Sequence, residues 1–396
     1  MNQLTSGKPQ IVRHLNKTAI LNLIRSRQPI SRSELSRLTD LNKSTVSSIV
    51  ADLLDEKMVS ESSIGTSTGG RRPILLNLND SDYGVGAIEF GADYTYLAIS
   101  GLDATIRERD RLTSEPAEPV SFIRHCVARL KQLREVSGLQ MRSVGISVPG
   151  IVDAEASRII FSPELQWRNV EVGKIVANAM TPDLPTYVVV ENEANASVLA
   201  EQLFGALPDT SEMVFLSENL GAGIIVNGHL VHGASETAGQ FGHLTITDAE
   251  QPCPCGSHGC LTQYASSEAT VRSYFAKHAK RSTGNVEEAF LQMLRAARVG
   301  DITALDSFYA TGDYLGLGIS NIAKTIDPEV VVVGGLVTQA WDYVYPRIRR
   351  QLHRNVYYDI ENPVRVVPCS LRDRPALIGA IAIVVRHIFK RYHIYA

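Results

Sequence analysis

The chain has 396 residues, of which 44% are hydrophobic and 20% charged, and a formal net charge of −3. This composition is typical of a globular protein with two or three domains. No uncharged apolar run reaches the roughly 18 residues of a membrane span, and the N-terminus lacks the apolar stretch of a secretory signal. We therefore expect a cytoplasmic protein with reduced cysteines and no membrane partner.

The charge is distributed unevenly along the chain. Residues 1–73 carry 11 Lys and Arg against 6 Asp and Glu, a balance of +5, and the remaining residues carry 28 against 36, a balance of −8. We call residues 1–73 the head and the remaining residues the body. A basic head on an acidic body indicates that only the head binds a polyanion. The alternative is a solvated basic helix surface.

The head begins with three predicted helices. A helical apolar pattern over Asn16–Arg25 ends before Pro29, and Ser31 and Glu34 then have the spacing of a capping box. Asn42 can cap a third helix, whose first turns are polar and exposed. Side chains of this kind reach base edges and phosphates when a helix tip enters a major groove, and we expect this of Lys43, Ser44, Thr45, Ser47 and Ser48.

A predicted hairpin completes the head. Strand-like runs flank Gly65–Gly70, and Arg71 and Arg72 follow where the loop returns. This pattern predicts the wing of a winged helix-turn-helix, with both arginines in or near a DNA minor groove. A protein-docking module is the alternative, but the wing, the polar helix front and the charge of +5 together favour DNA.

From Tyr83 the chain alternates between strands and helices. Residues 83–113 predict a three-stranded meander, residues 213–231 predict a second one, and EVVVVGGLV predicts a buried strand that opens into a helix. This alternation of a strand meander with helices occurs twice, which indicates two α/β lobes with a ligand cleft between them. Trp167 is either a cleft residue or, as we favour, a core residue.

Three of the five cysteines lie within eight residues, at Cys253, Cys255 and Cys260. A thiol-rich loop suits Zn²⁺, and a tetrahedral site needs a fourth ligand, for which His243 and His258 are both candidates. The alternatives are a disulfide or three unrelated thiols. Cys126 and Cys369 stand alone, and we expect both in the core.

After the predicted winged helix-turn-helix come GISVPGIVD, NEANA, GAGIIVNG, GQFGHLTI, CPCGSHGCL and VVVGGLV. In this order the motifs resemble the ROK family, which joins sugar kinases and sugar-responsive repressors, and the chain is most similar to the xylose- and N-acetylglucosamine-type repressors. The resemblance implies an actin/hexokinase-like fold of two α/β lobes. We expect a DNA-binding domain over residues 1–78 and a ROK domain over 79–396. Lobe 1 would span 79–196 with the C-terminal helix 375–396, and lobe 2 would span 197–374.

The resemblance also assigns site residues. It selects His243 as the fourth ligand of a structural Zn²⁺, because the family pairs this Gly-His with the cysteine loop. The family's sugar-binding positions correspond here to Glu164, Asn192, Glu193, Gln240 and His243. Glu164 replaces an Asn, and Gln240 replaces a Glu. A polar ligand is therefore expected, but its identity does not carry over from relatives.

Two positions argue against the kinase activity that some family members have. The phosphate hairpin D-x-G-G-T-K reads Glu89–Tyr94 here, without the Lys and with Asp93, an anion that is hostile to a polyphosphate. The second phosphate loop survives only in part, as Asn219–Gly223. The catalytic Asp after Asn is Glu193, which moves the carboxylate by roughly 1 Å, and general-base catalysis depends on reach.

The sequence thus predicts a non-enzymatic transcriptional repressor of carbohydrate metabolism genes. Its partners would be double-stranded operator DNA, a sugar or sugar-phosphate effector, and further copies of itself in a homodimer or homotetramer. The first alternative is a repressor whose effector is a protein, such as a sugar-transport component. An ATP-dependent sugar kinase with a regulatory head is the less favoured alternative.

Overall fold

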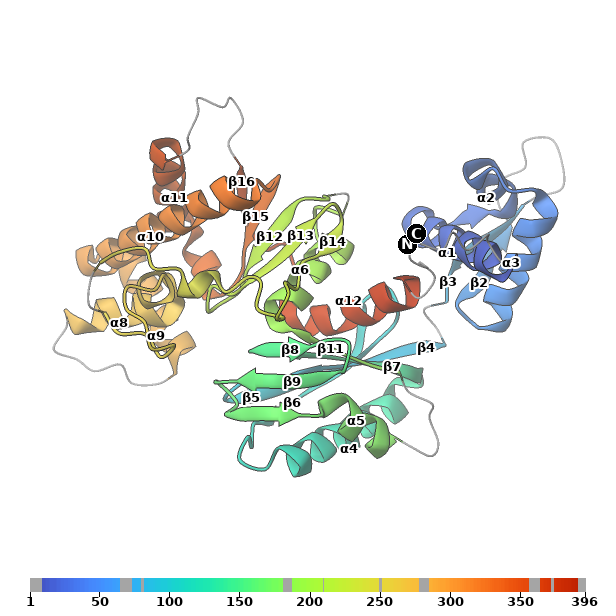
Figure 1. Cartoon of the computed structure of the whole chain (residues 1–396), viewed down its shortest axis with the longest axis horizontal. Helices are drawn as coiled ribbons and strands as arrows, with labels where there is room; N and C mark the ends of the chain where they lie inside the picture. Colours follow the sequence, from blue (N-terminus) through green and yellow to red (C-terminus); the bar gives the residue numbers. More distant parts are fainter. Residues whose placement is uncertain are drawn as a thin grey trace, which may run out of the picture. The chain divides into compact units, whose positions relative to one another are not determined.

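The structure is a computed structural model that describes residues 9–64, 73–79, 82–180, 187–208, 210–248, 251–277, 285–355, 364–371 and 374–390. The chain divides into two compact units (Figure 1). One contains Met1–Glu191 and Ala380–Ala396, and the other contains Asn192–Gly379. The first unit therefore includes both the predicted head and a discontinuous α/β body.

The head has its own small core and a sheet of order β1-β3-β2. Its elements are α1 (Pro9–Arg27), β1 (Ile30–Ser31), α2 (Arg32–Thr39), α3 (Lys43–Asp55), β2 (Val59–Ile64) and β3 (Ile74–Leu78). β3 pairs antiparallel with both of its neighbours. The predicted helices and hairpin strands are confirmed, and the apolar stripes meet in a core that includes Ile20, Ile24, Leu35, Val46, Ile49, Leu53 and Leu76.

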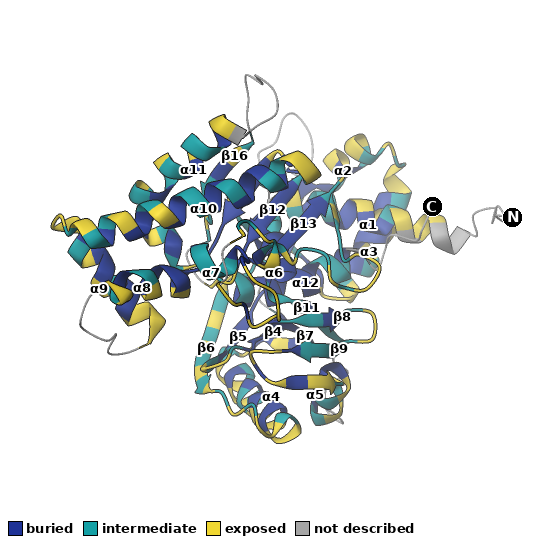
Figure 2. Ribbon diagram, turned by 60° about the vertical axis from the view of Figure 1, so that its left-hand side comes forward, coloured by how far each residue is buried: buried dark blue, intermediate teal, exposed yellow. Residues whose placement is uncertain are grey.

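The body of the first unit is a sheet of order β11-β7-β4-β5-β6. These strands are β4 (Tyr83–Glu89), β5 (Tyr94–Ser100), β6 (Ile106–Thr113), β7 (Gln140–Val148) and β11 (Tyr187–Asn192). β4, β5 and β6 form the predicted antiparallel meander, and β7 runs parallel to β4. β4 is buried along its length, whereas β6 alternates between partly buried and exposed residues (Figure 2).

Helices cover both faces of this sheet (Figure 1). α4 (Pro119–Ser137) packs on one face with α5 (Val172–Met180) beside it, and α12 (Pro375–Lys390) covers the other. A second, small antiparallel sheet contains β8 (Ile151–Asp153), β9 (Arg158–Ser162) and β10 (Trp167–Val170). Trp167 is 2% exposed, packs against Phe90 and donates from Nε1 to the Pro116 carbonyl at 2.8 Å, which confirms the core interpretation.

The second unit is built on a sheet of order β14-β13-β12-β15-β16. Its strands are β12 (Met213–Leu216), β13 (Ala222–Val226), β14 (His229–Leu230), β15 (Val330–Val333) and β16 (Arg365–Pro368). β12, β13 and β14 form the second predicted meander, while β15 lies parallel between β12 and β16. The Val330–Val333 run is buried on both faces, as expected for a central parallel strand.

The helical elements of the second unit lie on both sides of that sheet. They are α6 (Glu193–Phe204), the 3₁₀ helix η1 (Phe241–His243), α7 (Thr262–Ala265), α8 (Ser267–Ala276), α9 (Val286–Arg298), α10 (Ile302–Ile326), the 3₁₀ helix η2 (Leu336–Ala340) and α11 (Trp341–Asn355). α6 packs on β12 and β13. α10 and α11 share a core with the opposite strand face, through residues such as Val214, Val331, Leu315 and Ile348.

Close packing of α10 on α11 depends on glycine. A Cβ at Gly312 would lie 2.6 Å from the Val344 carbonyl oxygen, and one at Gly316 would lie 2.7 Å from Gln351 Cβ. Glycine destabilises a helix interior by about 0.5–1 kcal/mol relative to alanine, so the close packing of α10 on α11 must contribute more than this to stability. The two glycines bring the exposed edges of both helices within hydrogen-bonding reach.

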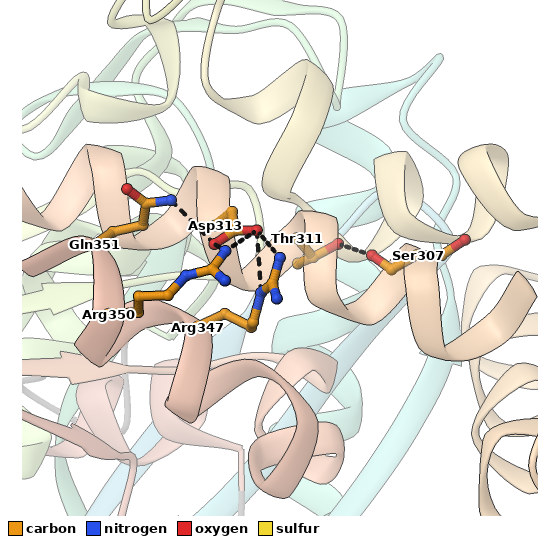
Figure 3. Close-up of polar contacts among 6 residues, drawn as sticks. All are labelled: Ser307, Thr311, Asp313, Arg347, Arg350 and Gln351. Atoms are coloured by element: carbon orange, nitrogen blue, oxygen red, sulfur yellow. Dashed lines mark hydrogen bonds and ion pairs between the residues drawn. The ribbon is translucent and has the colours of Figure 1, made fainter. Parts of the chain in front are cut away.

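A carboxylate joins these edges (Figure 3). Asp313 on α10 forms ion pairs with Arg347 and Arg350 of α11, the second at 2.9 Å, and accepts from Gln351 Nε2 at 3.0 Å. Burial by itself would raise the pKa of Asp313. The hydrogen bonds from Arg347, Gln351 and Arg350 outweigh burial, so the pKa of this carboxyl lies below its ordinary value.

We expect Asp313→Asn to destabilise the α10–α11 pair by about 1–3 kcal/mol, because two arginines lose their counterion. A lowered pKa in the folded state means that the ionised carboxylate stabilises the fold above the ordinary pKa, and that this contribution is lost as pH falls through the folded value. The deficit of the variant should therefore shrink below about pH 4. Hydrogen exchange of the α10 and α11 amides at neutral and acidic pH measures the loss of stability in the variant. The control is Asp342→Asn, an exposed carboxylate on α11, and equal exchange in both variants would contradict the assignment.

Candidate functional site

The two helices of the predicted helix-turn-helix are capped as expected. Ser31 Oγ accepts from the Glu34 amide at 3.3 Å and the Ser31 amide donates to Glu34 Oε2 at 3.0 Å, which completes the capping box of α2. Asp40 ends that helix in a left-handed conformation with φ 56°. Asn42 Oδ1 then accepts from the Thr45 amide at 2.8 Å and caps α3. These caps fix the turn and so the start of α3.

The outer face of α3 is polar where the sequence predicts DNA contacts. Lys43, Ser44, Ser47 and Ser48 are exposed, and Thr45 is partly buried. Ser48 Oγ accepts from Arg13 Nη2 of α1 at 2.9 Å, so this hydroxyl is already engaged within the head. Ala51 is also exposed, one turn beyond Ser47. The four-residue spacing of positions 43, 47 and 51 predicts that Ala51 lies on the same helix face. Alanine has no polar atom, however, so its residue type does not indicate a DNA contact.

A hollow of about 350 Å³ lies beside the first turn of α3. It brings Lys43 and Ser47 together with the start of α2 and the start of β3, and its lining residues are Ser31, Arg32, Ser33, Lys43, Ser47, Pro73 and Ile74. Arg32 forms an ion pair with Glu61 of β2 at 2.7 Å, which joins α2 to the hairpin. The sequence interpretation assigned no role to Arg32 or Ser33. The predicted wing arginines, Arg71 and Arg72, lie outside the described residues.

In the second unit, four predicted metal ligands converge. The ligand atoms of His243, Cys253, Cys255 and Cys260 all lie within 4.8 Å of one another. His243 ends η1, and the Thr245–Cys260 bridge brings this segment against the cysteine loop. His258, the other candidate in the sequence, is exposed and lies outside the cluster. None of the cysteines in the described chain forms a disulfide.

The spacing of these atoms fits a tetrahedral metal. Bond lengths to zinc of about 2.3 Å for sulfur and 2.0–2.1 Å for nitrogen give tetrahedral S···S and S···N edges of about 3.8 and 3.6 Å. Cys255 Sγ lies 3.7 Å from Cys260 Sγ, and Cys253 Sγ lies 3.5 Å from His243 Nδ1. Gln263 Nε2 is 3.7 Å from Cys253 Sγ and can donate to it from outside the cluster.

The Cys260 thiol would need a cation to ionise. Burial and the two neighbouring thiols raise the pKa of Cys260 to about 12, and a bound metal ion would supply the positive charge that stabilises its thiolate. Four protein ligands complete a tetrahedron and leave no open position, which is the arrangement of a structural rather than a catalytic site.

The predicted ligand-binding residues of the second unit lie near the start of α6 and along η1. Asn192 caps α6, its Oδ1 accepting from the amides of Ala194 and Asn195 at 2.8 and 3.2 Å. Glu193 Oε1 accepts from Ser217 Oγ at 3.2 Å. Gln240, which directly precedes η1, and His243, which ends it, are both exposed. This part of the unit thus offers amide, carboxylate and imidazole groups, which suit a polyhydroxylated ligand.

Three further predictions concern the first unit and the lone cysteines. Glu164 is exposed in the turn between β9 and β10. Glu89–Tyr94 is a hairpin between β4 and β5, with Asp93 exposed on it. Cys126 is buried as expected, but Cys369 is only partly buried. The core prediction is wrong for Cys369, because it follows an edge strand and its thiol donates to Glu201 Oε2 at 3.3 Å.

Comparisons with known proteins agree with these features. The sequence profile of the ROK family matches residues 85–387. The xylose repressor of Bacillus subtilis (strain 168) is 32% identical over 386 residues, which cover 95% of this chain and 96% of that protein. Among the described residues, no helix combines the length and apolar content needed to cross a bilayer.

Two solved structures extend the comparison. One is a ROK family transcriptional regulator, a homologue of the Escherichia coli Mlc protein, with a TM-score of 0.83 and 24% identity over 96% of this chain and 97% of that one. The other is a ROK family glucokinase from Streptomyces griseus in complex with glucose and AMPPNP. It has a TM-score of 0.65 and 27% identity, over 77% of this chain and 99% of the glucokinase.

We expect the purified protein to contain about one zinc ion per chain, and Cys260→Ser to lose it. A structural zinc site contributes on the order of 10 kcal/mol of apparent binding free energy, much of it as local folding, so residues 243–260 should exchange their amides faster in the variant. Elemental analysis and hydrogen exchange on one preparation measure both effects. Cys369→Ser, a thiol outside the cluster, should keep the metal. Full metal content in Cys260→Ser would rule out this ligand set.

Proposed function

Since the chain belongs to the ROK family, we propose that it is a transcriptional repressor of carbohydrate metabolism genes, controlled by a sugar or sugar derivative. The observation that carries the proposal is the exposed polar first turn of a capped α3 in the head. The name of the Bacillus subtilis relative, a xylose repressor that matches 95% of this chain, supports it. Residues 1–78 would bind DNA and residues 79–396 would bind the effector.

In this proposal the first turn of α3 reads the operator. Lys43 and Ser47 would contact the major groove, together with Ser44, Thr45 and Ser48, and Arg71 and Arg72 would contact the minor groove or the backbone. Arg32 and Ser33 line the same hollow as Lys43, and an arginine and a hydroxyl suit a phosphate beside the groove. A homodimer or homotetramer in the cytoplasm would present two heads to two half-sites.

The effector would bind through the second unit, at Asn192, Glu193, Gln240 and His243, with Glu164 as a further predicted contact. Asn192 Oδ1 caps α6 by accepting from the Ala194 amide, which fixes this side chain at the start of the helix. His243 directs Nδ1 towards Cys253, which leaves Nε2 for the ligand. A zinc ion would hold that imidazole in place. An effector changes DNA binding only if it favours one state of the protein over the other.

The alternative of a sugar kinase is supported by the similarity to a glucokinase over 77% of this chain. We propose that the protein is not an enzyme, because Glu193 stands where the kinases have Asp and Asp93 lies in the hairpin that would face phosphates. Incubation with ATP and hexoses, pentoses or amino sugars is expected to give no sugar phosphate. Phosphoryl transfer that Glu193→Gln abolishes would overturn this.

Lys43→Ala should weaken operator binding and flatten its dependence on salt. Removing one side chain that neutralises a DNA phosphate lowers the slope of log affinity against log salt concentration by roughly 1. The pair Arg71→Ala and Arg72→Ala should act in the same direction. Fluorescence anisotropy with labelled operator across a salt series gives the slopes. Lys174→Ala is the matched control, since Lys174 is an exposed lysine on α5. Slopes equal to that of the wild type would remove Lys43 from the interface.

A sugar effector should raise the melting temperature of the wild type, and Glu193→Gln should weaken its binding by about tenfold or more. Hydrogen bonds that involve a charged group contribute about 1.5–3 kcal/mol, more than neutral ones. A panel of sugars and sugar phosphates in thermal unfolding identifies the ligand, and titration calorimetry compares the variants. Glu268→Gln, an exposed carboxylate on α8, should bind like the wild type. A panel without any effect would favour a protein effector instead.

A further inference from the structure

The short helix α7 begins two residues after Cys260, the last ligand in the cluster of His243 and the three cysteines. Its second residue, Gln263, contacts this cluster twice. The backbone amide of Gln263 donates to the Cys260 carbonyl at 2.9 Å, and the side-chain Nε2 lies 3.7 Å from Cys253 Sγ. One residue outside the cluster therefore contacts both ends of the cysteine loop.

Arg272 of α8 determines which way the side-chain amide of Gln263 points. Arg272 Nη2 lies 2.9 Å from the Gln263 carbonyl oxygen and 3.2 Å from Gln263 Oε1. A guanidinium group has donors and no acceptor, so the amide atom that faces it has to be the oxygen. The other atom of the amide, Nε2, is then directed to Cys253 Sγ as a hydrogen-bond donor.

The sulfur that receives this donor belongs to a residue with little access to water. Cys253 is 6% exposed, whereas Cys255 is an exposed residue. A thiolate that ligates a metal keeps negative charge, and a buried charged group needs a hydrogen-bond donor in place of water. Hydrogen bonds from outside the ligand set also orient the ligand, and losing one typically lowers metal affinity by about 10–100-fold. Gln263 is placed to supply this bond to Cys253.

Arg272 acts on the Gln263 amide through hydrogen-bond geometry rather than through its charge. Its side chain is 44% exposed, so solvent and salt screen the guanidinium. Arg272 Nη1 lies 3.9 Å from Glu268 Oε1, and an exposed ion pair of this kind contributes little to stability. The two contacts with Gln263 are shorter than this ion pair, and they join α8 to α7.

We propose that Gln263 is a positioning residue of the metal site, and that Arg272 holds its amide in the orientation that donates to Cys253. The contacts run from Arg272 through Gln263 to Cys253 Sγ. They fix the direction of one thiolate toward the other ligands and raise the affinity of the cluster for Zn²⁺. The inference rests on the zinc site and is independent of DNA binding and of the sugar effector.

The test measures the zinc affinity of the full-length protein by competition with a chromophoric chelator. Gln263→Leu removes the amide at similar volume and should weaken zinc binding by about 10–100-fold. Its zinc content in excess zinc should stay at about one ion per chain, because all four ligands are present. Gln292→Leu, the same change at an exposed glutamine of α9, should bind zinc like the wild type.

Gln263→Glu separates the hydrogen bond from any role in packing. This variant keeps the shape of the side chain and gives Arg272 a carboxylate partner, so the contact between α7 and α8 is retained. Both of the new side-chain oxygens are acceptors at neutral pH, and one of them faces the thiolate. Zinc affinity should therefore fall at least as far as in Gln263→Leu, and the thiolate-to-metal absorption band of the Co²⁺-loaded protein should shift. A purely structural role of Gln263 predicts neither change, and this variant also carries the test if Gln263→Leu does not fold.

Arg272→Met tests the other step of the chain of contacts. It should weaken zinc binding several-fold in the wild-type background and have no further effect in Gln263→Leu, because Arg272 acts only through the amide. Glu268→Gln, which removes the ion-pair partner of Arg272, should bind zinc like the wild type.

Unchanged zinc affinity and an unchanged Co²⁺ spectrum in Gln263→Glu would overturn the role of Gln263, and so would an equal loss of affinity in Gln292→Leu. Equal losses from Arg272→Met in both backgrounds would overturn the role of Arg272. A wild-type protein without zinc would contradict the metal assignment itself, so the two kinds of failure are distinguishable.

Discussion

The cluster of His243 with the three cysteines determines the shape of a segment that has little else to hold it. Between β14 and α7 the described chain contains only the three-residue η1 and two isolated bridges as regular structure. Loops of this length with little regular structure are uncommon in compact domains and are usually functional. The cluster supplies a cross-link where Gln240 and His243 offer polar groups to a ligand. A metal bound there would stabilise the loop and orient the side chains that we propose sense the effector.

In the head, the first turn of α3 and the middle of α3 differ in their contacts with the rest of the domain. Asn42 and the Ser31–Glu34 box fix the start of α3, where Lys43 and Ser47 are exposed. Further along, Arg13 of α1 engages Ser48 and Asp52. The first turn is therefore accessible, while the middle of the helix is tied to the domain. Sequence readout would be concentrated in the residues that the cap positions.

Much of this architecture could be predicted from short-range patterns. Capping residues, strand alternation and the cysteine spacing depend on neighbours in the chain, and the structure confirms the head helices, both meanders and the convergence of His243 with the cysteines. The contacts that were missed join distant segments. Glu218 meets Leu336 across 118 residues, and Asp313 meets Arg347 across 34. Their partners depend on strand order and helix packing, which no local pattern encodes.

The position of α12 has a consequence for how the chain folds during synthesis. The strands of the first body sheet are complete by Asn192, yet α12, the helix that covers one face of them, follows all the strands of the second unit in the chain. A Cβ at Gly145 of β7 would lie 1.7 Å from the Ala380 carbonyl oxygen. The backbone of α12 therefore packs directly against β7. During synthesis on the ribosome, the sheet face of the first unit that α12 covers is exposed while the second unit is translated and can fold. Synthesis of α12 then completes the unit that was made first, and premature termination before residue 375 leaves a product whose exposed sheet is a target for chaperones and proteases.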